Sequence, residues 1–137
     1  HYTLEMMTEF TKESLAYALN LSKSRYLNYL NPSDFNDIEK RVGLLLKNEY
    51  FTSLLAKSEF LTEQAILYND ELKIIDLLLK HNDQYIVFDY KTTAQEHDEH
   101  ISQVAYYKKA VKEIFNTKEV AGFIIYLKSD EVFFKNI

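Results

Sequence analysis

Apolar positions in the first part of the chain recur every three or four residues, which is the spacing of an amphipathic helix. This pattern runs from residue 2 to residue 30. It ends at Asn31-Pro32, because the residue before a proline avoids the helical backbone region. Ser33 then provides an N-cap for the next helix. The expected helices therefore cover residues 2–30, 33–47 and 49–56.

From residue 59 onward the apolar residues form short runs that are typical of strands. The first two runs are joined at Asn69-Asp70, which suits a tight hairpin turn. Apolar residues occupy both faces of these runs, as in a sheet that is covered on both sides. The pattern predicts an α/β fold built on a small mixed sheet flanked by helices. The expected strands cover residues 59–68, 71–80, 85–91, 119–128 and 132–135, with a helix over 98–115 and a hairpin across Ser129-Asp130.

Length and composition indicate one domain, with a helical part over residues 1–57 and a sheet core over 58–137. No apolar run approaches 18 residues, so we expect no membrane span. The chain has no cysteine, which excludes disulfides and thiolate metal sites and is compatible with a reducing cytoplasm, where we expect the protein. The net charge of −5 argues against a domain that grips DNA through bulk positive potential. The abrupt start of the chain suggests a fragment of something larger.

Two acidic residues and a lysine are the most informative positions. Asp89 and Lys91 are two residues apart in the third strand, so both side chains project from one face. Asp76 lies in the second strand, where alternation predicts a shared face with Leu72, Ile74 and Leu78. The alternative is that both aspartates are solvated strand-end residues. Asp76, however, interrupts a run of isoleucine and leucine, which solvated aspartates rarely do.

Carboxylates from neighbouring strands could converge on one hard divalent cation, which prefers oxygen ligands. The ion that this donor set favours is Mg²⁺, for which Mn²⁺ can substitute. The main-chain carbonyl of Tyr90 is close enough in sequence to be a third ligand. Lys91 would then orient or deprotonate an attacking water and balance charge on a phosphate. This combination is what metal-dependent phosphodiester cleavage requires.

The helix after the third strand carries a second candidate pair. Gln103 and Tyr107 are four residues apart and so lie on the same helix face, from which an amide and a phenol could contact a phosphate. The alternative is that both residues merely cover the sheet. The segment 96–100 combines two histidines with three acidic residues and could suggest a second metal site, although a solvated acidic loop that caps the helix is the better explanation.

Taken together, these residues resemble the motifs of the RecB-type nucleases, a family within the PD-(D/E)xK superfamily of restriction-endonuclease-like folds. The likeness is to the C-terminal nuclease domain of AddA, a helicase–nuclease subunit that processes double-strand breaks for recombination. It covers essentially the whole chain and is strongest over residues 59–135. The matching stretch is Glu63-(x)12-Asp76-(x)12-Asp89-Tyr90-Lys91-Thr92-(x)10-Gln103-(x)3-Tyr107.

The resemblance implies a restriction-endonuclease-like fold and a role for each matching residue. Asp76 and Asp89 correspond to metal ligands, Lys91 to the catalytic lysine, and Gln103 with Tyr107 to a supporting helix motif. The family also carries an upstream histidine that completes the metal shell. His1, followed by Leu4 and Glu5, fits that pattern, although a histidine at this position could equally be the remnant of an expression tag.

The function that the resemblance implies is a Mg²⁺-dependent DNA exonuclease module of an AddA-like helicase–nuclease. Its expected partners are DNA, delivered as a single strand by the motor, and an AddB-like subunit. The chain itself has no glycine-rich phosphate loop for an ATPase motor. The alternatives are a stand-alone RecB-like nuclease and an inactive nuclease-like scaffold that guides DNA or binds a partner. The absence of cysteine speaks against the cluster-bearing CRISPR adaptation nucleases.

Overall fold

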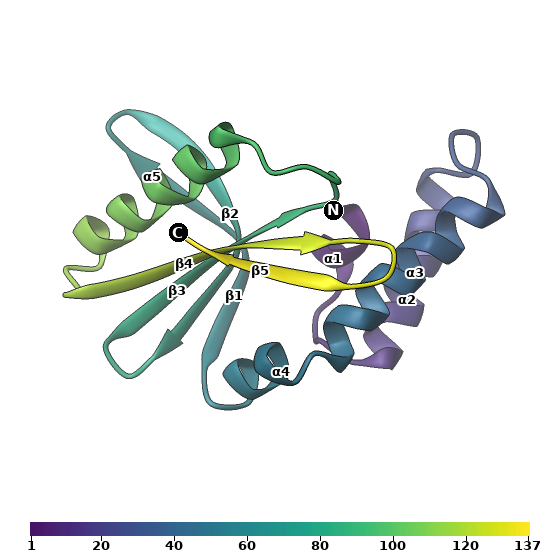
Figure 1. Ribbon diagram of the computed structural model, residues 1–137, viewed down its shortest axis with the longest axis horizontal. Coiled ribbons are helices and arrows are strands. Elements are labelled where there is room, and N and C mark those ends of the chain that lie inside the picture. Colours follow the sequence, from purple (N-terminus) through teal and green to yellow (C-terminus); the bar gives the residue numbers. More distant parts are fainter.

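The computed structural model describes residues 1–137 as one five-stranded sheet with helices on both sides (Figure 1). The helices and strands have the following bounds: α1 Tyr2–Met6, α2 Lys12–Arg25, α3 Pro32–Lys47, α4 Glu49–Ala56, β1 Glu59–Tyr68, β2 Glu71–His81, β3 Gln84–Lys91, α5 Asp98–Ile114, β4 Glu119–Leu127 and β5 Val132–Asn136.

The strands lie in chain order across the sheet, from β1 at one edge to β5 at the other. All neighbours are antiparallel except β3 and β4, which are parallel and joined through α5. Asn69 and Asp70 both have positive φ angles, of 50° and 63°, which is the turn that a two-residue hairpin favours. The predicted α/β fold with a small mixed sheet is confirmed.

The prediction of one helix over residues 2–30 was wrong. The chain forms α1, an irregular segment and α2, because two side chains there satisfy backbone groups locally. Thr11 accepts a hydrogen bond from the main-chain N–H of Ser14 and so caps α2. The hydroxyl of Ser14 in turn accepts hydrogen bonds from the N–H groups of Thr8 and Glu9, and this pattern competes with helix.

The predicted N-cap of the second helix was also wrong, by two residues. Asn31 caps α3 through a capping box, in which its side chain accepts from the Asp34 N–H and the Asp34 carboxylate accepts from the Asn31 N–H. Pro32 occupies the first turn of α3, where the missing N–H costs nothing. The Asn-Pro pair therefore begins the helix as well as ending the segment before it.

The apolar residues form one core on each side of the sheet. The larger core joins the N-terminal helices to the sheet through aromatic contacts, such as that of Phe51 in α4 with Phe88 in β3, whose ring centroids are 6.0 Å apart. The smaller cores lie under α5, where Val104 and Val111 are fully buried. In Figure 1, α5 runs along one face of the sheet and the N-terminus lies beside the end of β3.

The expected alternation along β2 breaks at Asp76. Ile74 is 51% exposed, whereas Ile75 is buried in the same cluster as Leu78, so the shared face predicted for Ile74 and Leu78 was wrong. At the same level the ladder between β1 and β2 lacks the pair of Glu63 with Asp76, and Glu63 has a φ angle of 49°, while the register is the same on both sides. Such a distortion re-aims the side chains around it, and it lies beside the acidic residue of interest.

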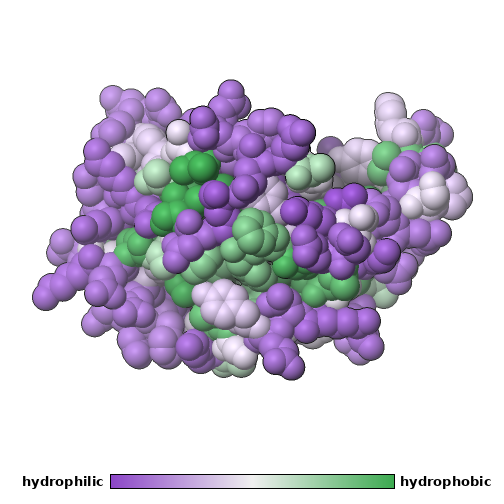
Figure 2. Space-filling view, viewed as in Figure 1, coloured by the Kyte–Doolittle hydropathy of each residue, from purple (hydrophilic) through white to green (hydrophobic).

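The rest of the surface adds little to this picture. Hydrophilic residues dominate the face in Figure 2, with a band of apolar residues across its middle. Tyr50 is exposed and contacts Phe134, which packs against the larger core, with a centroid distance of 5.5 Å. No helix has both the length and the apolar character that crossing a membrane would require.

Candidate active site

The two aspartates meet where β2 separates from β3. The ladder between these strands ends at Leu77 and Phe88, and continuing its register places Asp76 opposite Asp89. Beyond this point the Asp76 side chain takes the place of a main-chain carbonyl of β2. Its Oδ2 accepts a hydrogen bond of 2.9 Å from the Tyr90 N–H. This bond fixes the Asp76 side chain beside the main chain of Tyr90.

His1, at the start of the chain, lies beside the same Asp76 carboxylate. His1 Nε2 lies 3.6 Å from Asp76 Oδ2, and the main chain of Tyr90 contributes to the raised pKa of the imidazole. Helix α1, which follows His1, is anchored to α2 by a buried hydrogen bond of 2.7 Å between the hydroxyls of Thr3 and Ser22. The structure therefore brings His1 and Asp76 together beside the main chain of Tyr90, and the strand register places Asp89 opposite Asp76. It does not gather His1, Asp76 and Asp89 into one metal-binding group.

Lys91 lies next to Asp89, as expected for residues two apart in a strand. Its Nζ is 3.0 Å from Asp89 Oδ2, and the two side chains are only 19% and 5% exposed. The contact lacks hydrogen-bond geometry, so this buried carboxylate oxygen accepts no hydrogen bond. A buried, unsatisfied carboxylate oxygen is costly and is rarely retained without a partner.

Gln103 and Tyr107, the predicted pair of residues on α5, are connected to Lys91 by hydrogen bonds. Gln103 Oε1 accepts a hydrogen bond of 3.1 Å from Lys91 Nζ, and Gln103 Nε2 donates one of 2.9 Å to the Tyr107 hydroxyl. Gln103 and Tyr107 therefore do more than cover the sheet, because together they fix the ammonium of Lys91 over Asp89.

The electrostatics of the site follow from its burial. Burial, followed by the negative charge of the neighbouring Asp76, raises the pKa of Asp89 to about 6 against the opposing effect of Lys91. Burial would also raise the pKa of Asp76, but contact with His1 and the hydrogen bond from the Tyr90 N–H outweigh it and lower that pKa. Contact with Asp76 in turn raises the pKa of His1. Adjacent carboxylates with opposite shifts are typical of functional sites.

Glu63, which matched an acidic position of the family pattern, lies near these groups but outside their hydrogen bonds. Its pKa is raised, first by burial and then by the negative charges of Asp76 and Glu5. Of the two histidines in segment 96–100, His100 turns toward the sheet, where its Nδ1 lies 3.2 Å from the Tyr126 hydroxyl. The two histidine rings contact each other at a centroid distance of 5.1 Å.

Sequence reasoning missed Arg41, which holds the ends of the two parallel strands. From α3, its Nη1 donates hydrogen bonds to the main-chain carbonyls of Leu127, at 2.6 Å, and of Thr92, at 3.5 Å. Its Nε donates to Asp37 one turn earlier in the helix. Thr92 directly follows Lys91, so Arg41 fixes the strand end that carries the site. A lone arginine in a helix gives no sequence signal of such a contact.

The residues present fit a single magnesium ion. The structure contains no group of three or more histidine and carboxylate side chains arranged to hold a metal by themselves. Mg²⁺ usually takes only one or two carboxylates, with water and substrate oxygens completing its shell. Asp76 and Asp89 are two such carboxylates. Asp89 Oδ2 accepts no hydrogen bond, although the Lys91 ammonium lies 3.0 Å from it.

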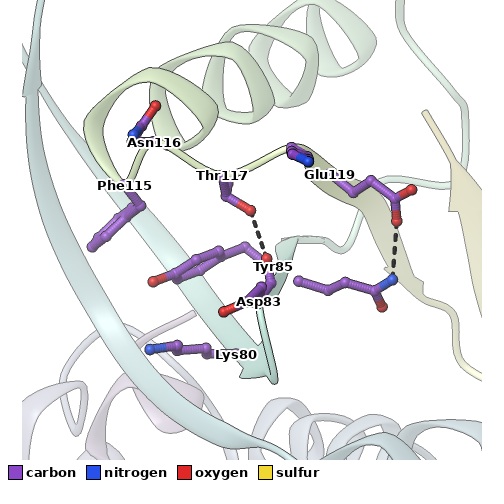
Figure 3. A pocket seen from close by; sticks show the side chains of 9 residues that line it. Lys80, Asp83, Tyr85, Phe115, Asn116, Thr117 and Glu119 are labelled. Atoms are coloured by element: carbon purple, nitrogen blue, oxygen red, sulfur yellow. Dashed lines mark hydrogen bonds between the residues drawn. The ribbon is translucent and has the colours of Figure 1, made fainter.

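Two hollows flank the sheet, at opposite ends. One, of about 690 Å³, opens in front of Lys91 and Gln103. The other, in Figure 3, lies at the starts of β3 and β4, where Gln84 donates to Glu119 and the Thr117 hydroxyl to the Asp83 carbonyl. Two hydrogen bonds link polar groups that line this second hollow. The first hollow reaches the candidate site through Lys91, Gln103 and Tyr107, whereas neither aspartate lines it.

Comparisons with known proteins add little. No family model matches the chain, and no curated protein is identified as a relative. Among solved structures, the chain is similar to one titled "Crystal structure of SSO0001", with 18% sequence identity and a TM-score of 0.44. The match covers 99% of this chain and 64% of the other, so the chain spans less than two thirds of that protein's length. The site is therefore interpreted from its own residues.

Proposed function

We propose that this chain is a Mg²⁺-dependent deoxyribonuclease of the RecB type, with a restriction-endonuclease-like fold. The observation that carries the proposal is that Asp76 and Asp89 lie opposite each other where the β2–β3 ladder ends, with Lys91 3.0 Å from Asp89 and with His1 and the Tyr90 N–H against Asp76. Burying two carboxylates and an ammonium together is expensive unless they serve a ligand or a reaction. The motif order that resembles the RecB family agrees with this interpretation.

Within the proposal, each residue has a role that its contacts support. When bound, Mg²⁺ would activate water and neutralise the charge that develops on the phosphate. Asp76 and Asp89 would hold the ion, with the Tyr90 carbonyl and His1 beside it. Lys91 would hold the attacking water or a phosphate oxygen through its ammonium. Gln103 keeps that ammonium in place.

We further propose that the chain works as the exonuclease module of an AddA-like helicase–nuclease in double-strand break repair. A net charge of −5 gives the isolated chain little bulk attraction for DNA. A motor that threads single-stranded DNA to the site, together with an AddB-like subunit, would supply the missing grip. The expected location of such an enzyme is the cytoplasm.

The first test is cleavage of an end-labelled single-stranded oligonucleotide by the 137-residue chain. We expect products to appear with Mg²⁺ or Mn²⁺ and to vanish when EDTA is added. The products are measured on a denaturing gel over time, with oligonucleotide and metal but no protein as the blank. A well-folded chain that cleaves nothing with either metal would contradict the nuclease assignment and would favour the inactive scaffold.

A further inference from the structure

A row of three side chains leads from Lys91 across the sheet to its edge. Lys91 in β3 pairs in register with Tyr126 in β4, and Tyr126 pairs with Phe133 in β5. Paired residues on neighbouring strands project from the same face. Since neighbouring strands are about 4.8 Å apart, the backbone of Phe133 lies roughly 10 Å from that of Lys91. The face is the one that carries α5, because Lys91 binds Gln103 of that helix.

The outer end of this row is an exposed aromatic ring on a rigid base. Tyr126 is 1% exposed and is held by the contact of its hydroxyl with His100, whereas Phe133 is 42% exposed. The two rings are stacked, with centroids 6.1 Å apart and planes inclined by 27°. Lys128 places its ammonium 5.5 Å from the centroid of the Phe133 ring. An exposed flat ring is what a nucleobase stacks on, and the Lys128 ammonium that lies over this ring is the cation that a bound nucleotide meets there.

The surface around Phe133 continues the hollow at the candidate active site. Lys91 and His100 line the hollow in front of the site, while Tyr126 and Phe133 line the next one, of about 630 Å³. The contact between His100 and Tyr126 joins the two. A strand with a phosphate at Lys91 could therefore continue over Phe133 without leaving the surface.

We propose that Phe133 is a stacking platform for a nucleobase of the DNA strand whose phosphate lies at Lys91. The position of that phosphate rests on the proposed nuclease function. Lys128 would face the backbone of the stacked nucleotide. Bases in a duplex are already stacked and paired, so the platform accepts an unpaired strand.

Stacking, rather than positive charge, accounts for the binding at this platform. Lys128 already lies 3.6 Å from Glu131, and Lys135 near the platform is paired with Glu96 at 2.8 Å. These ion pairs neutralise most of the local positive charge. Binding at Phe133 should therefore depend on the ring and should change little with base sequence.

The test is fluorescence anisotropy of a labelled oligothymidylate, with Ca²⁺ in place of Mg²⁺ to prevent cleavage. We expect Phe133→Ala and Phe133→Leu to weaken binding about tenfold, since stacking on one aromatic ring contributes that order of affinity. Phe133→Tyr, which keeps a flat ring, should bind as the parent does. The matched control is Phe115→Ala, because Phe115 is 38% exposed at the opposite end of the sheet, and it should leave binding unchanged.

The platform would be overturned if Phe133→Leu bound with unchanged affinity, or if Phe115→Ala lost as much affinity as Phe133→Ala. It would also be overturned if the parent chain bound no oligothymidylate. Melting temperatures show that each variant is folded. Failure of the platform and failure of the nuclease function give different results. If the parent chain binds DNA in a Phe133-dependent way but never cleaves it with Mg²⁺, only the nuclease function is contradicted. If Phe133→Leu cleaves at the parental rate at low substrate concentration, only the stacking platform is contradicted.

Discussion

Asp89→Asn is expected to abolish Mg²⁺-dependent DNA cleavage and, at the same time, to stabilise the metal-free protein above neutral pH. Asparagine keeps the shape of the side chain but removes the charge that would hold the cation. We expect the cleavage rate to fall by ~10³-fold or more, which corresponds to about 4 kcal/mol of transition-state stabilisation. The fold should persist, because the amide has the shape of the carboxylate and Lys91, which loses its ion pair, keeps its hydrogen bond to Gln103.

The stability gain follows from the raised pKa of Asp89. Its pKa of about 6 in the folded protein exceeds the usual 3.8, so the folded state binds the proton more tightly. That contribution to stability is fully present below pH 4 and is lost as the pH rises through 6. Asparagine never ionises. The free energy of unfolding of Asp89→Asn should therefore equal that of the parent near pH 4 and exceed it by on the order of 2–3 kcal/mol at pH 8.

Denaturant unfolding in EDTA at several pH values measures this difference directly. Asp76 has a lowered pKa, so its contribution to stability is lost as the pH falls. This contribution is present in both proteins. The matched control is Asp83→Asn, which changes an exposed aspartate at the far end of the sheet and should alter neither stability nor cleavage. A variant that cleaves normally, or whose stability gain does not grow with pH, would contradict the role of Asp89.

Lys91→Met is expected to lower the cleavage rate by ~10²–10³-fold, the usual cost of removing one charged group that stabilises the transition state. It should also destabilise the metal-free protein at pH 8, because Asp89 loses the cation that lowers its pKa. The loss should shrink toward pH 5, where Asp89 becomes protonated. Thermal unfolding and cleavage kinetics across this range measure both effects.

A double-mutant cycle separates catalysis from stability at this pair. In the Asp89→Asn background, Lys91→Met should cost little stability, because the buried negative charge is already gone. Lys80→Met is the matched control, since Lys80 lies at the far end of the sheet, and it should leave cleavage intact. If Lys91→Met kept the parental rate, or if Lys80→Met lost as much activity, Lys91 would have no special role.

The strands could be predicted from the sequence because each is a short apolar run between strong turn signals. Asn69-Asp70 marked the first hairpin, and the lengths of the apolar runs then placed the ends of the strands to within a residue or two. The break after α1 could not be predicted in this way. It depends on which backbone groups Thr11 and Ser14 bind, and apolar periodicity carries no information about such hydrogen bonds.

The candidate site could be located from the sequence because Asp76 interrupts an apolar run and Asp89 precedes Lys91 by two residues. The sequence could not give the shift in alternation beside Glu63, because a non-glycine residue with positive φ leaves no pattern. Nor could it reveal Arg41 or the row that ends at Phe133. Both depend on the register between strands and helices that are far apart in the chain.

The central claim is that Asp76 and Asp89 hold one divalent cation beside Lys91. It is tested most directly by anomalous diffraction from crystals of this chain soaked in Mn²⁺. We expect one strong manganese peak at about 2.0–2.3 Å from a carboxylate oxygen of each aspartate and close to the Tyr90 carbonyl. The peak should be absent from crystals of Asp89→Asn. Manganese found only elsewhere, or no ion between the two aspartates at saturating Mn²⁺, would contradict the claim.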